Sequence, residues 1–219
     1  MEPNYEKAAN LAAVTLINHH IAAAPVSPLP ILKSMSNVLV MSFGEIGSLL
    51  RMDRKEIVPM FGQHNQDAVT FVEIVNGKPH YMVAYNQQLP FSLVQRSLAR
   101  ELSHIVLEHD GSRPEEVRNE ESRCFAHHLL TPRALIHSVQ ATGIRFTVEV
   151  LGNLTGCYDR CLCSMRKLPP VHTSPEYNRI LRDNFTPYVM NFFECQRVLS
   201  LEDGSALADF GKYMEGYEE

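Results

Sequence analysis

Hydrophobic residues recur every three to four positions along most of the chain, and this spacing predicts a mainly helical protein. It indicates a first helix over residues 4–23. Three prolines follow that helix, and Ser27 is placed to cap a short helix that ends at residue 35. Two more short helices are expected at residues 44–50 and 53–60.

The pattern changes to that of β-strands in two regions. A short apolar run at residues 37–43 indicates a buried strand, and runs rich in β-branched and aromatic residues occupy residues 68–75 and 79–85. Asn76-Gly77-Lys78 joins the last two runs, and Asn-Gly between such runs is the strongest short-range signal for a β-hairpin. The side chains that alternate on one face of the final run are Tyr81, Val83 and Tyr85.

The candidate chemistry lies within residues 97–132. In the first part of this stretch an apolar helix side is supplied by Leu98, Leu102 and Ile105, and a polar side by Arg100, Glu101 and His104. Because Arg100 and His104 are four residues apart, one turn of helix presents both side chains to the same space.

This helix reads R-E-L-S-H, one letter away from the H-E-x-x-H motif of zinc peptidases. In that motif two histidines hold the metal, and the glutamate acts as general base on the metal-bound water. Arginine at the first position cannot bind a metal because it stays protonated in proteins. The same spacing also describes the polar face of any amphipathic helix, so the motif alone leaves both interpretations open.

More helices are expected after this one. His109-Asp110-Gly111 is typical of a helix end with glycine as the left-handed cap, and Pro114 suits the first turn of the next helix. Further helices are expected at residues 132–140, from Thr155 to residue 166, and after a proline-rich linker at residues 168–175.

In sequence order, the hairpin, the R-E-L-S-H helix and a second helix ending in C-F-A-H-H-L-L-T-P resemble the ImmA/IrrE family of zinc metallopeptidases. Members of this family read approximately A-H-E-L-G-H, a short acidic spacer, and then E-x-E-A-N-x-F-A-x-x-L-L-x-P. Residues 24–35 are similar to the family's L-P-V-D-P-x-x-I-x-x-x-L block, so the resemblance covers about residues 5–165. The matching positions in the two helical blocks are Ala99, Glu101, Leu102, His104, Ile105, Phe125, Ala126, Leu129, Leu130 and Pro132.

The resemblance implies an α+β fold of the zincin-like metallopeptidase type, mostly helical with a small sheet or hairpin beside the active-site helix. It implies a metallopeptidase-fold domain at residues 1–167. After the proline-rich linker, the residue pattern indicates a helical C-terminal extension at residues 168–219 with an acidic and aromatic tail. An edge strand beside the active-site helix of zincins can pair with an extended substrate. A peptide is therefore expected to contact the hairpin at Tyr81, Val83 and Tyr85, although a purely structural hairpin fits the pattern equally well.

The chain departs from the family at the positions that bind zinc. The first ligand position holds Arg100, and the third, a glutamate in the family, falls on Asn119. A second-shell asparagine or aspartate of the family falls on Arg123. By the resemblance, His104 remains as a zinc ligand and Glu101 as the general base.

Two consequences of these changes are open. An altered zinc site would draw on other side chains, for which the candidates are Glu121, His127 and His128, with His109 as a further one. Alternatively, the two arginines pair with neighbouring glutamates, Arg100 with Glu101 and Arg123 with Glu120 or Glu121. Two guanidinium groups at the former metal site would disfavour a divalent cation. The resemblance thus implies zinc as cofactor, while two changed ligand positions of three argue against it.

Composition limits the partners and the compartment. The chain has 219 residues and a net charge of −5, which argues against direct binding of nucleic acid. It contains no apolar run long enough to span a membrane, and its N-terminus lacks the pattern of a signal peptide. Its five cysteines, an odd number, fit reduced thiols, and Cys157, Cys161 and Cys163 are expected to be buried free thiols rather than zinc ligands. A cytoplasmic protein is therefore expected.

Two functions follow from the resemblance. The first is a catalytically impaired, peptidase-fold regulator that binds a protein or peptide partner. Family members commonly belong to mobile elements and relieve transcriptional repression by cleaving, or promoting cleavage of, a helix-turn-helix repressor, so such a repressor is the expected partner. The second is an active zinc endopeptidase with a rearranged ligand set, in which Glu101 activates water to cleave the repressor. The changed ligand positions favour the first.

Overall fold

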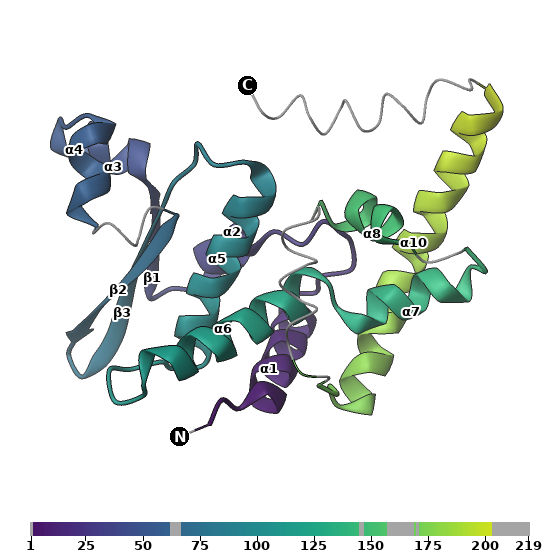
Figure 1. Cartoon of the computed structure of the whole chain (residues 1–219), viewed down its shortest axis with the longest axis horizontal. Helices are drawn as coiled ribbons and strands as arrows, with labels where there is room; N and C mark the ends of the chain where they lie inside the picture. The colour runs from purple at the N-terminus through teal and green to yellow at the C-terminus, as the bar shows by residue number, and fades with distance from the viewer. Residues whose placement is uncertain (1, 62–66, 145–146, 157–168, 170, 203–219) are drawn as a thin grey trace. The chain divides into compact units, whose positions relative to one another are not determined.

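The computed structural model describes residues 2–61, 67–144, 147–156, 169 and 171–202. In these residues the fold is α+β, with a small sheet among a larger number of helices (Figure 1). The chain divides into two compact units. The first unit contains residues 1–3 and 27–126, and the second contains residues 4–26 and 127–219.

The sheet belongs to the first unit and has three strands in the order β1-β3-β2. β1 (Val38–Ser42) pairs in parallel with β3 (Lys78–Tyr85), and β2 (Ala68–Val75) pairs with β3 in the antiparallel direction. The predicted hairpin is confirmed. Asn76 and Gly77 adopt φ angles of 52° and 75° at its turn, a backbone conformation that asparagine and glycine tolerate best.

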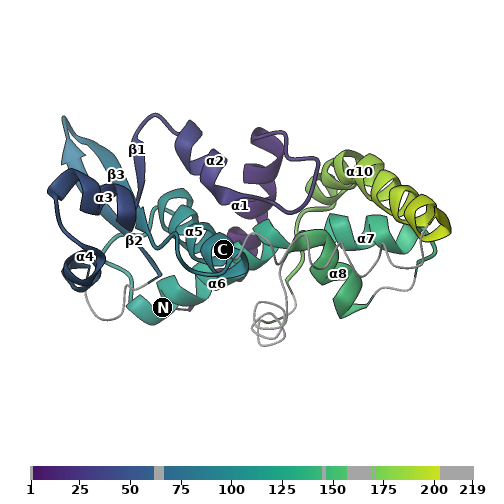
Figure 2. The same ribbon diagram turned by 90° about the horizontal axis from the view of Figure 1, so that it is seen from above.

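The two faces of the sheet carry different helices (Figure 2). On one face, α3 (Phe43–Leu50) and α4 (Arg54–Met60) close a cluster of buried residues made of Phe43, Ile46, Ile57 and Ala84. On the other face, α5 (Phe91–Val106) packs on β2 and β3, and α2 (Pro28–Ser34) packs on β1 and α5. The short helices predicted at residues 44–50 and 53–60 are confirmed, and Ser42 and Asp53 each form a capping box at the start of one of them.

The helix with the R-E-L-S-H sequence is α5, and α6 (Glu115–Leu130) follows it. The end of α5 differs from the prediction at Gly111. The helix ends at Val106, and the residue in the left-handed region is Glu108, with φ of 55°. The chain therefore reverses three residues earlier than expected, and this reversal sets the place of His109.

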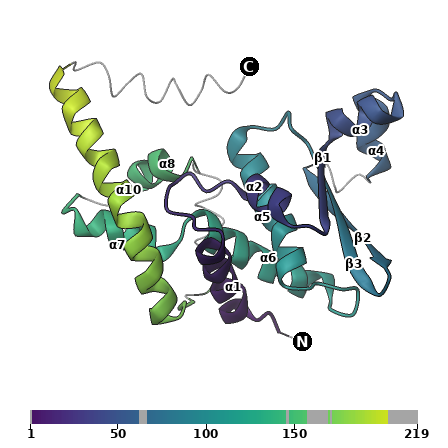
Figure 3. The ribbon, with the colours of Figure 1, turned by 180° about the vertical axis from the view of Figure 1, so that it is seen from behind.

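The second unit is helical in its described residues. It contains α1 (Tyr5–Asn18), α7 (Arg133–Ala141), α8 (Val148–Thr155) and α10 (Pro175–Glu202). α10 runs along α7 and also contacts α1 (Figure 3). The small side chains of α1 allow this close packing, because its buried residues are Ala8, Ala9, Ala12, Ala13, Thr15 and Leu16. A hydrogen bond of 3.0 Å between the hydroxyls of Ser138 and Thr186 further joins α7 to α10.

The compact units do not follow the boundary expected after residue 167. α1 belongs with α7 and α10 instead of with the sheet, and the chain passes from the first unit to the second between Ala126 and His127. The helix expected from Thr155 to residue 166 is also corrected at its start, because Thr155 ends α8 and Gly156 forms a left-handed cap. Residues 157–166, with the three closely spaced cysteines, lie outside the described residues.

Candidate functional site

A cleft of about 590 Å³ lies in the first unit, beside β2, α5 and the first part of α6. Its lining is mostly polar. The residues that line it are Asp67, Ala68, Val69, Thr70, Val72, Tyr81, Ser97, Arg100, Glu101, His104, His109, Asp110, Gly111, Glu115, Arg118 and Asn119. The structure thus brings Arg100, Glu101, His104 and Asn119 to one place, although they come from two helices.

Glu101 is held by the sheet. Thr70 of β2 donates a hydrogen bond of 2.7 Å from its hydroxyl to Oε2 of Glu101. Burial raises the pKa of Glu101, and the hydrogen bond from Thr70 and the charge of Arg100 only partly offset this effect. A carboxyl group with a raised pKa in a cleft has the properties of a general base or acid.

The ion pair between Arg100 and Glu101, one of the two interpretations that the sequence left open, is not formed. Nη2 of Arg100 donates instead to Oδ1 of Asn119, over 3.0 Å. Burial lowers the pKa of Arg100, and the nearby charge of Glu101 opposes this. The two positions at which the resemblance requires zinc ligands are therefore joined to each other by a hydrogen bond between α5 and α6.

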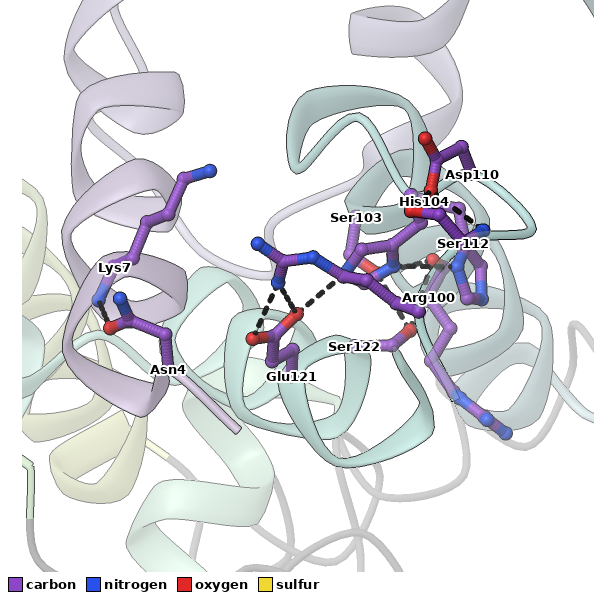
Figure 4. A network of polar contacts seen from close by, with 11 residues as sticks. Asn4, Lys7, Arg100, Ser103, His104, Asp110, Ser112, Glu121 and Ser122 are labelled. Carbon is purple, nitrogen blue, oxygen red and sulfur yellow. Dashed lines mark hydrogen bonds and ion pairs between the residues drawn. The ribbon is translucent and has the colours of Figure 1, made fainter. Parts of the chain in front are cut away.

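A second brace between these helices lies one turn away. Ser103 donates to Oγ of Ser122 over 2.6 Å, and Ser122 in turn contacts the carbonyl oxygen of Arg100 at 3.2 Å. Figure 4 shows Ser103 and Ser122 facing each other beside the labelled polar residues. Ser103 and Ser122 are fully buried, so α5 and α6 hold the cleft wall in a fixed arrangement.

His104 starts a chain of buried polar contacts that leads away from Glu101. Its Nδ1 lies 2.8 Å from Nδ1 of His109, and Nε2 of His109 lies 2.8 Å from Oε2 of Glu121. Arg113 donates from Nη1 to both carboxylate oxygens of Glu121, over 3.0 and 2.9 Å. Figure 4 shows the ion-paired carboxylate of Glu121.

The groups at the two ends of this series of contacts determine which ring nitrogens carry protons. The Glu121 carboxylate only accepts, so Nε2 of a neutral His109 donates to it and Nδ1 of His109 accepts from Nδ1 of His104. Burial is the main cause that lowers the pKa of His104 to about 3, and the neighbouring His109, Arg100 and Arg118 contribute to the same shift. His104 is thus neutral at pH 7, with Nε2 left as an acceptor.

The other side chains considered as zinc ligands, those of Glu121, His127 and His128, make contacts of their own. The carboxylate of Glu121 is 1% exposed and already accepts from Arg113 and His109. Arg123 forms an ion pair with Glu120, as one of the two expected pairings states. His127 and His128 belong to the second unit, where Nδ1 of His127 lies 2.7 Å from the hydroxyl of Thr131. The altered ligand set with His127 or His128 therefore gains no support from these contacts.

The hairpin residues expected to contact a peptide divide into two groups. Tyr81 lines the cleft, and Tyr85 is half-buried. Val83 is fully buried, because β3 is the central strand and its cleft-side face is covered by α5. Val83 thus has no exposed side chain to offer a peptide, and the strand edge open to backbone pairing is that of β2, which within the described residues pairs on one side only.

The donor atoms at the positions that the resemblance assigns to zinc ligands do not fit a catalytic zinc site. Such a site uses three protein ligands and a water molecule. Here one imidazole, one guanidinium and one carboxamide occupy these positions, and the guanidinium binds the carboxamide. Among the residues that the structure describes, no three His, Cys, Asp or Glu side chains are grouped as a metal site requires.

Arg118 is one of the cleft residues that the sequence did not single out. It lies next to Asn119 on α6 and lines the cleft, yet nothing in the local pattern distinguishes it from other charged residues of that helix.

Comparison with protein-family models, curated proteins and solved structures finds no match for the chain. None of the described helices combines the length and apolarity needed to cross a membrane.

Proposed function

We propose that the cleft of the first unit binds an extended segment of a protein partner without hydrolysing it. In this proposal the chain is a peptidase-fold regulator of the ImmA/IrrE type whose metal centre has been replaced by a hydrogen-bonded pair. The observation that carries the proposal is the contact between Arg100 and Asn119.

This contact argues against hydrolysis for two reasons. The guanidinium of Arg100 and the carboxamide of Asn119 are hydrogen-bonded, so placing a cation there requires breaking this bond and bringing two positive charges together. Glu101 keeps its position, but it is fixed by Thr70. Without a metal-bound water to act on, its raised pKa supports hydrogen bonding to a ligand instead of water activation.

The edge of β2 supports binding of an extended peptide. An edge strand offers unpaired backbone N–H and C=O groups, which a second strand can pair with. Val72 and Ile74 point to the same side of β2 and are 60% and 65% exposed. Tyr81 lines the cleft beside them. Exposed apolar side chains along an unpaired edge are costly in water and favour a partner.

The partner class comes from the resemblance. A helix-turn-helix repressor of a mobile element, bound in an extended segment, is the partner that we propose. This assignment places the protein in the cytoplasm, where such repressors act, and gives it a role in transcription regulation through protein contacts and not through nucleic acid.

An active zinc endopeptidase with a rearranged ligand set remains the alternative. The contact that favours it is the short distance between Nδ1 of His104 and Nδ1 of His109, since two imidazole nitrogens directed at each other can also be directed at a metal. Glu121 would then orient His109 from its other nitrogen, as carboxylates do in metal sites. This arrangement supplies two ligands and leaves the third without a candidate.

The proposal is tested by selecting peptides from a random-sequence display library on the full chain and then measuring affinity and integrity. We expect selected peptides to bind and to stay intact on prolonged incubation with added zinc, as judged by mass spectrometry. Because pairing along β2 uses alternate N–H groups, N-methylation of the peptide should weaken binding at every second position only.

Cleavage of the bound peptide, abolished in Glu101→Gln, would instead establish the endopeptidase. The matched control is Thr70→Val, which removes the hydrogen bond to Glu101 and retains the shape of the side chain. A peptidase would lose rate in Thr70→Val, whereas a binding cleft should lose affinity only modestly.

A further inference from the structure

We propose that the cleft holds an acidic side chain of the bound peptide, a glutamate or an aspartate, at Arg100 and Arg118. This inference rests on the proposed function and adds to it the chemistry by which the partner is recognised. It starts from two guanidinium groups, on α5 and α6, whose hydrogen-bonding capacity is not fully used within the described part of the chain.

Arg118 carries the first part of the argument. Its Nε is buried and has no hydrogen-bond partner, and among the described residues its guanidinium forms no ion pair. A buried N–H group without an acceptor costs about 1–3 kcal/mol. Arg118 lines the cleft, so an acceptor can reach it only from a ligand in the cleft or from water.

Arg100 also has a buried hydrogen-bond donor without a partner. One of its nitrogens donates to Asn119, and its buried Nε lacks a partner. Asn119 follows Arg118 directly on α6, so the hydrogen bond keeps the two arginines on the same wall of the cleft. Both charges also reach His104, which places them around one point. A planar guanidinium matches a carboxylate best, with two parallel hydrogen bonds.

The nearby carboxylates do not fill this role. Glu101 accepts from Thr70, Glu121 from Arg113, and Glu120 is paired with Arg123. Among the described residues neither Arg100 nor Arg118 forms an ion pair, and the Nε of each can still donate to a ligand.

The acidic residues at the cleft mouth refine the preference. Asp110 and Glu115 are exposed, and Asp67 is half-buried with a charge that reaches Arg100. Water and salt screen exposed charges at the mouth, but a strongly acidic ligand would still meet repulsion there. We therefore infer one acidic residue in the bound segment, flanked by neutral or basic residues.

The geometry of an added strand brings such a residue to the arginines. Thr70 and Val72 project from β2 toward α5, as the contact between Thr70 and Glu101 shows. A peptide strand paired with β2 directs every second side chain to the same side. Its alternate residues thus lie over Val72 and Ile74 or reach the cleft wall that carries Arg100 and Arg118. The selected segment should carry a single acidic residue, separated from its apolar residues by an even number of positions so that all of them project to the same side of the strand.

The test repeats the peptide selection on the full-length wild type, Arg118→Gln and Arg51→Gln. Arg51 is an exposed arginine at the end of α3, outside the cleft lining, and serves as the matched control for loss of one charge. Peptides selected on the wild type and on Arg51→Gln should share one Asp or Glu at a fixed place among apolar residues. Peptides selected on Arg118→Gln should lack this preference. Circular dichroism checks that Arg118→Gln is folded, and Arg118→Lys provides a second variant that keeps the charge without the planar fork.

Affinities then give the coupling between the two groups. Replacing the acid of a selected peptide by its amide should weaken binding to the wild type by about tenfold or more, the effect of one charge-assisted contact. The same replacement should change binding to Arg118→Gln by less than about threefold, so that a double-mutant cycle shows coupling. For Arg118→Lys, the loss of affinity caused by this replacement should lie between the values for the wild type and Arg118→Gln.

The outcomes separate this inference from the proposed function. Peptides that bind the wild type with no acid preference, or with the same preference in Arg118→Gln, contradict the anion site and leave the peptide cleft standing. Failure to select any peptide contradicts both. Binding of inorganic phosphate to the wild type and not to Arg118→Gln, without acid preference among peptides, would show a site for a free anion and overturn the assignment to a peptide side chain.

Discussion

At the scale of single residues, the first unit contains two ion pairs that differ in burial. The carboxylate of Glu121 is 1% exposed and accepts from Arg113 and His109, whereas Glu120 and Arg123 are each 33% exposed. A buried carboxylate that loses a partner keeps its desolvation cost, while an exposed pair exchanges its partner for water. These neighbours on α6 therefore allow a direct comparison of the two environments.

Arg113→Ala should lower the free energy of unfolding by about 1–3 kcal/mol, because it removes an ion-pair partner from a carboxylate that is 1% exposed. Arg123→Ala should lower it by less than about 1 kcal/mol, since its pair is partly exposed. Urea denaturation of both variants at neutral pH measures the difference. Equal losses would mean that burial does not distinguish the two pairs.

At the scale of helices and strands, much of the architecture follows from local patterns. The hairpin, the short helices around Asp53 and the helix with the R-E-L-S-H sequence are all where the sequence places them, because each is set by nearby residues. The predicted end of that helix was wrong because a non-glycine residue, Glu108, adopts the left-handed conformation in place of Gly111. Sequence rules favour glycine there, and tertiary contacts of His109 override them.

The candidate site could be predicted only in part, again because tertiary contacts are not contained in local sequence patterns. Arg100, Glu101, His104 and Asn119 were identified from spacing and resemblance, and the cleft contains all four. The hydrogen bond between Arg100 and Asn119 was not foreseen, since it depends on how α5 packs against α6. Local periodicity describes which side of a helix is polar, but not which polar group on another helix faces it.

The turn of the hairpin provides a prediction at this scale. Gly77 has φ of 75° and open space around it, so Gly77→Ala adds a side chain with no clash and only the strain of the left-handed region. The free energy of unfolding should fall by about 1 kcal/mol. Gly111→Ala is the matched control, because its surroundings are equally open and its φ is not in that region; it should change stability by a few tenths of a kcal/mol. Thermal unfolding of both variants measures the two losses of stability. Equal losses would contradict the left-handed backbone conformation assigned to Gly77.

At the scale of the whole molecule, the division into two units was not predicted. α1 is at the start of the chain but packs on α10, which begins at Pro175. Helical periodicity identifies α1 as amphipathic but carries no information about which distant helix covers it. The cleft residues all belong to the first unit, so the proposed binding function resides in residues 27–126.

The central claim is that a metal centre has been replaced by a hydrogen-bonded pair in a binding cleft. The most direct test is the zinc content of the full chain, purified without chelators or a histidine tag, beside His104→Ala and the double variant Arg100→His, Asn119→Glu. We expect zinc far below one ion per chain in the wild type and in His104→Ala. We expect close to one ion per chain in the double variant, which supplies all three ligands of the zinc peptidase pattern. One zinc ion per wild-type chain, lost in His104→Ala, would contradict the replacement of the metal centre and favour the zinc endopeptidase.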